Sequence, residues 1–269
     1  MTMMGTGSWN VLSGTDTDRV VLAVDFPAAG RPAGSFADLA SLLDVQCSVW
    51  ECVPPSVGVP TSFGIEAGMR GDDYVDRWLG DVRASGREVL AVMGYCSGCG
   101  FSALLAEHIA QWQEMPKQVL FDPDAPSTSY VYWQFHRVIG EFSVVLSPKE
   151  IIAAQQAGKK LADEIVDLAE LSYALFTIFI EVGATGFDRA GIGGAHRADL
   201  TSHFASYLAY IVASSQLDPL RAWKVATAIS STAPGAGGKI AQEEFRFDID
   251  HLDLLRDTDV ARRVSEVLG

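Results

Sequence analysis

The sequence predicts an α/β fold built on a mostly parallel, doubly wound sheet. Short apolar runs that end in turn residues alternate with helical patterns from Arg19 to Pro126. Such alternation is typical of parallel βαβ units, in which helices cover both faces of the sheet. At 269 residues the chain can bury roughly three quarters of the surface that its unfolded form exposes. We therefore expect one large domain over residues 1–269.

Four apolar runs predict the first strands, because each is bounded by Gly, Pro or other turn residues. They are "RVVLAVDFPAAG" from Arg19, "CSVWECVPP" from Cys47, "EVLAVMGY" from Glu88 and "KQVLFDPDAP" from Lys117. Between the first three runs, the pattern "SFADLASLL" predicts a helix capped by Ser35, and "DDYVDRWLGDVRASG" predicts one that ends at Gly86. A third helix follows the strand that ends in "GY".

After Pro126 the alternation stops, and from Lys149 to about Gln216 the pattern is helical almost throughout. We interpret residues 127–216 as a helical insertion between strands. The strand pattern resumes in "AWKVATAISST" and "FRFDID". The final pattern, "DTDVARRVSEVL", predicts a closing helix capped by Asp257.

Composition excludes several classes of function. A net charge of −14 argues against a nucleic-acid partner, whose phosphates are neutralised mainly by Lys and Arg. The longest apolar run without a charge, Leu171 to Ile180, is about half of a bilayer crossing, so no membrane span is expected. Four cysteines do not make a disulfide framework in a chain of this length, and the first residues do not read as a leader, so a cytoplasmic location is expected.

The stretch "GYCSGCG", Gly94 to Gly100, allows three interpretations of its two cysteines. Cys96 and Cys99 could form a CxxC redox pair at a helix N-terminus, although thioredoxin-like folds carry this motif much earlier in a shorter chain. A zinc site would need two further ligands, and Cys47 with Cys52 offers only a CxxxxC spacing. The third interpretation is a nucleophile elbow, in which Cys96 takes the serine position of GxSxG.

The elbow explains the glycines as well as the cysteine. Its central residue adopts a strained backbone between a strand and a helix, so the residues two before and two after it must be very small, as Gly94 and Gly98 are. The predicted strand before Gly94 and helix after Gly98 supply the required context. The alternative without a catalytic role is a glycine-rich turn around a buried, inert cysteine.

Four short segments resemble the α/β-hydrolase thioesterases of nonribosomal peptide and polyketide biosynthesis. They are "FPAAG", "GYCSGCG", "VLFDPDAP" and "DIDHLDLL", which fall in that family's order along nearly the whole chain. The resemblance implies an α/β-hydrolase fold in which the insertion at about 127–216 is a lid. A homodimer interface through the same apolar surface of the insertion is the alternative.

The resemblance also assigns a catalytic constellation. Cys96 would be the nucleophile, and His251 the general base, because it alone among the five histidines stands at the family's position. Asp122 would hold the imidazole in its tautomer, with Asp124 as the alternative acid. Backbone N–H groups of Ser97 and of Ala29 or Ala28 would form the oxyanion hole. Cys99 reads as a packing residue that oxidation could pair with Cys96.

These assignments imply an enzyme that takes an acyl or peptidyl group from the phosphopantetheine thioester of a separate carrier protein onto Cys96. The group would then pass to an amine or hydroxyl acceptor, to water, or back onto itself in a cyclisation. No metal and no cofactor of the chain's own is expected. Two alternatives stay open at this point: a carrier-independent cysteine esterase or lactonase, and an inactive acyl-binding protein of the same fold.

Overall fold

The computed structural model describes residues 7–27, 33–64, 67 and 70–269. The chain divides into two compact units. Unit 1 comprises Met1–Pro54, Gly71–Ala125 and Gln216–Gly269, and unit 2 comprises Pro55–Arg70 and Pro126–Ser215. Unit 2 includes residues 127–215 of the insertion expected at about 127–216, and also Pro55–Arg70, which the sequence did not assign to the insertion. The function of this unit as a lid stays a prediction.

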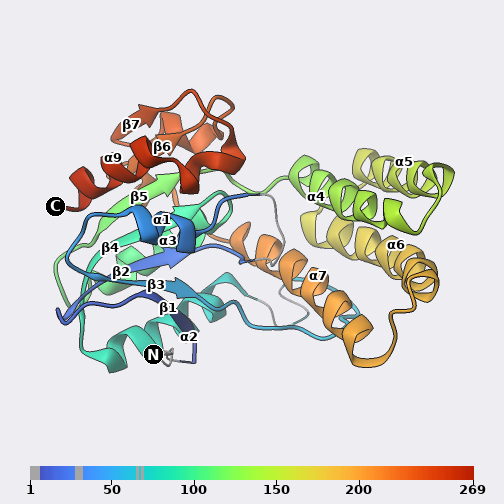
Figure 1. Cartoon of the computed structure of the whole chain (residues 1–269), viewed down its shortest axis with the longest axis horizontal. Coiled ribbons are helices and arrows are strands. Elements are labelled where there is room, and N and C mark those ends of the chain that lie inside the picture. The colour runs from blue at the N-terminus through green and yellow to red at the C-terminus, as the bar shows by residue number, and fades with distance from the viewer. Residues whose placement is uncertain (1–6, 28–32, 65–66, 68–69) are drawn as a thin grey trace. The chain divides into compact units, whose positions relative to one another are not determined.

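Within the described residues of unit 1, seven strands form one sheet in the order β1-β3-β2-β4-β5-β6-β7 (Figure 1). The strands are β1 (Trp9–Ser13), β2 (Arg19–Val24), β3 (Ser48–Cys52), β4 (Glu88–Tyr95), β5 (Lys117–Phe121), β6 (Thr227–Ser230) and β7 (Glu243–Arg246). Strand β1 runs antiparallel to β3, and the other neighbouring pairs are parallel. The predicted mostly parallel sheet is confirmed.

Helices cover both faces of this sheet, as a doubly wound fold requires. Unit 1 contains α1 (Phe36–Leu42), α2 (Gly71–Ser85), α3 (Gly98–Ile109), α8 (Leu220–Trp223), α9 (Thr258–Leu268) and the 3-10 helices η3 (Ala236–Lys239) and η4 (His251–Arg256). Successive residues of a strand point to opposite faces. Phe121 accordingly packs in the core of α1, η4 and α9, whereas its neighbour Leu120 packs with Cys99 of α3 and Trp223 of α8.

The predicted helix caps are present at the starts of α1 and α9. Ser35 and Asp38 form a capping box at the start of α1, in which each side chain bonds to the other residue's backbone N–H. Asp257 accepts hydrogen bonds from the backbone N–H groups of Asp259 and Val260 at the start of α9. These local contacts fix where the two helices begin.

Within the described part of unit 2, residues 55–64 are irregular and the chain after Pro126 is mostly helical. Its elements are α4 (Thr128–Glu141), the 3-10 helix η2 (Phe142–Val144), α5 (Pro148–Glu164), α6 (Leu168–Arg189) and α7 (Gly194–Ser214). Aromatic side chains fill its core; the rings of Phe179 in α6 and Phe204 in α7 lie 4.5 Å apart. Helix α4 begins well before Lys149, where the sequence first indicated helix.

Helix α6 is long and apolar enough, by length and composition, to cross a membrane, and it is the one such helix among the residues that the structure describes. Its Leu171, Leu175, Phe176 and Phe179 are buried in the core of unit 2. Packing within a helical core accounts for such a composition as well. The expected absence of a membrane span stays a prediction.

Candidate active site

Cys96 lies at the sharp turn between β4 and α3. Its φ of 51° places it in the left-handed region, which non-glycine residues rarely adopt and which recurs at functional sites. The backbone N–H of Cys96 donates to the carbonyl of Phe121 at 2.9 Å, and the N–H of Cys99 donates to the carbonyl of Cys96 at 3.1 Å. The turn is thus fixed to strand β5 on one side and to α3 on the other. The Cys96 side chain is half-buried.

Gly94 is required by the close approach of α3 to β4. A Cβ atom at this position would lie 2.5 Å from Ser102 Oγ and 2.7 Å from Cys99 Cα, distances that real Cβ atoms essentially never show. The strand and the helix could not approach as they do with any larger residue. This close contact explains why the first position of the GxCxG pattern is a glycine.

Gly94→Ala is therefore expected to destabilise the protein by about 1–3 kcal/mol or more, because the backbone of α3 would have to move. The measurement is the free energy of unfolding in urea. Gly80→Ala in α2 is the matched control: a Cβ there meets open space, and alanine is the better helix former by up to about 1 kcal/mol. Equal losses for the two variants would contradict the packing explanation.

Asp122 and His251 meet at the carboxyl end of the sheet. Asp122 directly follows β5, and its φ of 43° is again left-handed. His251 Nδ1 lies 2.7 Å from Asp122 Oδ2, and the carboxylate is only 3% exposed. The backbone N–H of Ser231 donates to Asp122 Oδ1 at 2.8 Å. Both carboxylate oxygens are therefore held, and the imidazole turns its Nδ1 toward the acid and its Nε2 away from it.

The Cys96 thiol lies close enough to the His251 imidazole to act on its pKa. Burial alone would lower the pKa of His251, but the interactions with Asp122 and Cys96 overcome it and raise this pKa from 6.5 to about 9. The site thus favours a protonated imidazole beside a sulfur, an arrangement that can stabilise a thiolate. Along the chain, η4, which begins at His251, follows β7.

This raised pKa predicts a pH dependence of stability. Folded His251 binds its proton more tightly than the unfolded chain does, so its contribution is fully present below about pH 6.5 and is lost as the pH rises to about 9. In urea unfolding, the stability difference between wild type and His251→Gln should accordingly narrow over this interval. A difference that stays constant from pH 6 to about pH 9 would contradict the assigned pairing.

The remaining candidate residues are placed as follows. Ser97 is buried and immediately precedes α3, so its backbone N–H belongs to the first turn of the helix. Ala29 and Ala28, expected to complete the oxyanion hole, lie outside the described residues. Asp124 is exposed and caps the N–H of Ala125. It does not bond to His251; Asp122 does.

Cys99 differs sharply from Cys96. It is fully buried, its sulfur faces the carbonyl of Phe121 at 3.8 Å, and burial raises the pKa of its thiol well above the usual value. All four cysteines are free thiols, and no group of three or more His, Cys, Asp or Glu among the described residues is placed to hold a metal ion. These features fit a packing role for Cys99. The other histidines lie in α3, α4 and α7.

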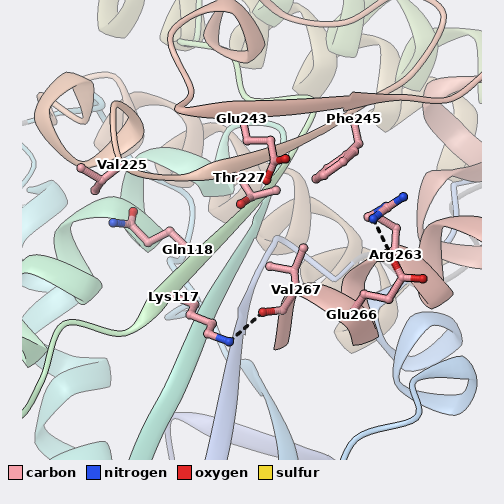
Figure 2. A pocket seen from close by; sticks show the side chains of 9 residues that line it. All are labelled: Lys117, Gln118, Val225, Thr227, Glu243, Phe245, Arg263, Glu266 and Val267. Atoms are coloured by element: carbon pink, nitrogen blue, oxygen red, sulfur yellow. Dashed lines mark hydrogen bonds and ion pairs between the residues drawn. The ribbon is translucent and has the colours of Figure 1, made fainter. Parts of the chain in front are cut away.

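A cavity of about 430 Å³ lies at the amino ends of strands β5, β6 and β7 (Figure 2). Its lining includes Lys117, Thr227 and Glu243, which begin β5, β6 and β7. Cys96 and Asp122, in contrast, follow the carboxyl ends of β4 and β5. Since the strands are parallel, this cavity is separate from the candidate active site.

Comparisons with known proteins bear on the fold. No family model and no curated protein matches the sequence. Solved structures similar to this chain include the Vlm2 thioesterase domain bound with a dodecadepsipeptide (TM-score 0.54, 11% identity, 95% of each chain covered). Others are the NocB thioesterase domain in covalent complex with a nocardicin G analogue (0.54, 12%, 98% of this chain and 100% of that one) and MGS-M2, an α/β-hydrolase enzyme from a Medee basin deep-sea metagenome library (0.51, 11%, 97% and 91%). With its sheet order and strand-helix turn, the chain has the α/β-hydrolase fold.

Proposed function

We propose that this protein is a thioesterase-like acyl transferase that takes an acyl or peptidyl group from the phosphopantetheine thioester of a carrier protein onto Cys96. The observation that carries the proposal is the chain of contacts from the Asp122 carboxylate through the His251 imidazole to the Cys96 thiol. An oriented imidazole beside a half-buried thiol is the arrangement that nucleophilic acyl transfer needs. The likeness to two thioesterase domains supports the choice of substrate class.

In the first half-reaction, the Cys96 thiolate attacks the thioester carbonyl carbon. The bond from that carbon to the pantetheine sulfur then breaks, and the His251 imidazolium gives its proton to the departing thiolate. In the second half-reaction, an amine, hydroxyl or water attacks the acyl-Cys96 carbonyl. His251 takes a proton from the attacking group, and the Cys96 thiolate leaves.

Sulfur suits transfer to an acceptor better than oxygen does. Moving an acyl group from pantetheine to Cys96 exchanges one thioester for another, so the step is near thermoneutral and the group stays activated. A serine would hold it as a less reactive oxoester. The proposal therefore includes release to an amine or hydroxyl acceptor, or by cyclisation, in preference to hydrolysis.

The test is intact-protein mass spectrometry after brief exposure to a panel of acyl-pantetheine and acyl-carrier thioesters. The expected result is a mass gain of one acyl group, mapped by peptide analysis to Cys96. Small oxoesters serve as the comparison panel. Labelling by oxoesters with none by thioesters would replace the proposal by a carrier-independent esterase or lactonase. No adduct from either panel, together with a Cys96 that resists iodoacetamide at neutral pH, would indicate an acyl-binding protein without this activity.

A further inference from the structure

Tyr95, the residue before Cys96, is held rigidly by the sheet. It is the last residue of β4, pairs with Phe121 of β5, and is only 5% exposed. Its side chain packs in the core that also contains Met93 and Leu254. Strand β4 lies between β2 and β5, and its pairing with β2 extends to Gly94, the residue before Tyr95. Tyr95 is therefore as firmly placed as the elbow itself.

Two separate contacts join Tyr95 to His251. The phenol ring stacks on the imidazole, with centroids 4.7 Å apart and an interplanar angle of 21°. The Tyr95 hydroxyl donates a hydrogen bond to the backbone carbonyl of His251 at 2.9 Å. One side chain thus restrains both the ring plane and the main chain of the same histidine.

His251 needs such restraint because its own secondary structure supplies little. It begins η4, a 3-10 helix of six residues, and short helices of this kind have poorer hydrogen-bond geometry than α-helices. Asp250 caps η4 by accepting a hydrogen bond from the backbone N–H of Leu252. This contact holds the start of η4 and not the imidazole. The contact with Asp122 fixes one nitrogen of the ring and leaves rotation about that hydrogen bond open.

The stacked ring also matters for the charge on His251. The face of an aromatic ring attracts a cation, so the phenol favours the imidazolium over the neutral imidazole. Asp122 and Cys96 are the titratable groups whose hydrogen bonds and charges act on this imidazole, from the end of β5 and from the elbow. Tyr95 covers the ring face, which neither of them occupies.

We propose that Tyr95 is a positioning residue that aligns the His251 imidazole with Cys96 by stacking on its ring and binding its backbone carbonyl. The nucleophile and the residue that orients its base are thus consecutive, so that the strand which fixes one also fixes the other. The expected effect of Tyr95 on turnover rests on the proposed function. Its expected effect on the reactivity of the Cys96 thiol is independent of that function, because alkylation requires no acyl substrate.

Two variants separate the contacts. Tyr95→Phe keeps the stacked ring and removes the hydrogen bond, which corresponds to roughly a fivefold loss in kcat. Tyr95→Leu removes both contacts and should lower kcat by roughly 10- to 50-fold. In both variants KM should stay unchanged, because Tyr95 acts through His251. The pH profile for alkylation of Cys96 by iodoacetamide should move to higher pH, more for Leu than for Phe.

Tyr74→Phe is the matched control, since Tyr74 is also buried in unit 1 but its ring packs on Trp78 and Phe101. It should leave the alkylation profile unchanged. Folded Tyr95→Phe with a wild-type alkylation profile would overturn the inference, and this variant preserves the ring volume should Tyr95→Leu fail to fold. A shifted profile in a protein that accepts no thioester would reject the proposed function and uphold the role of Tyr95.

Discussion

Cys96→Ala is expected to abolish formation of the acyl-enzyme and to lower turnover of the carrier-bound thioester by about 10⁴-fold or more, the scale seen when the nucleophile of a catalytic triad is removed. The thiol at the elbow interacts with His251, and alanine removes the attacking sulfur while the contact between His251 and Asp122 remains. The fold should persist, because the Cys96 side chain is only half-buried. Turnover and intact mass are measured together.

Cys99→Ala provides the control for this experiment. Cys99 lies three residues further on, fully buried beside Leu120 and Trp223, and burial raises the pKa of its thiol. Its replacement should reduce stability by about 1 kcal/mol through the lost sulfur and leave turnover within a few-fold of wild type. If Cys99→Ala instead abolished acylation while Cys96→Ala retained it, the elbow would have been assigned to the wrong cysteine.

The parts of the fold that the sequence predicted depend on local patterns. Strand β4 and the helix after it follow from an apolar run that ends in closely spaced glycines, and the caps of α1 and α9 follow from Ser35 and Asp257. Strand β1 was missed. Only Trp9 of its five residues is buried, so it lacks a clear alternation, and it exists as a strand through antiparallel pairing with β3.

For the candidate site as well, the sequence predicted some features and not others. Cys96, Asp122 and His251 were named from motifs in a known order, and the structure places His251 beside the other two residues. The contacts that support them were not predictable, because they join residues far apart in the chain. Ser231 is 109 residues from Asp122, and Tyr95 is 156 residues from His251. A sequence pattern with a short window contains no signal for such pairs.

Asp122→Asn is expected to lower turnover by about 10⁴-fold while the protein remains folded. The amide can accept the hydrogen bond from Ser231, but it presents a donor or a neutral oxygen to the imidazole in place of a carboxylate. The imidazole then loses the charge that stabilises its cation and the partner that fixes its tautomer. The measurement is kcat with the carrier-bound thioester, together with alkylation of Cys96 as a function of pH.

Asp124→Asn distinguishes this effect from a general loss of negative charge at the end of β5. Asp124 is exposed, and its side chain accepts a hydrogen bond from the N–H of Ala125, a role that asparagine can also fill. Its replacement should therefore leave both kcat and the alkylation profile unchanged. If Asp124→Asn were the damaging change and Asp122→Asn nearly silent, the 2.7 Å contact between Asp122 and His251 would not be the one that the reaction uses. Asp124 would then be the carboxylate that supports His251 during the reaction.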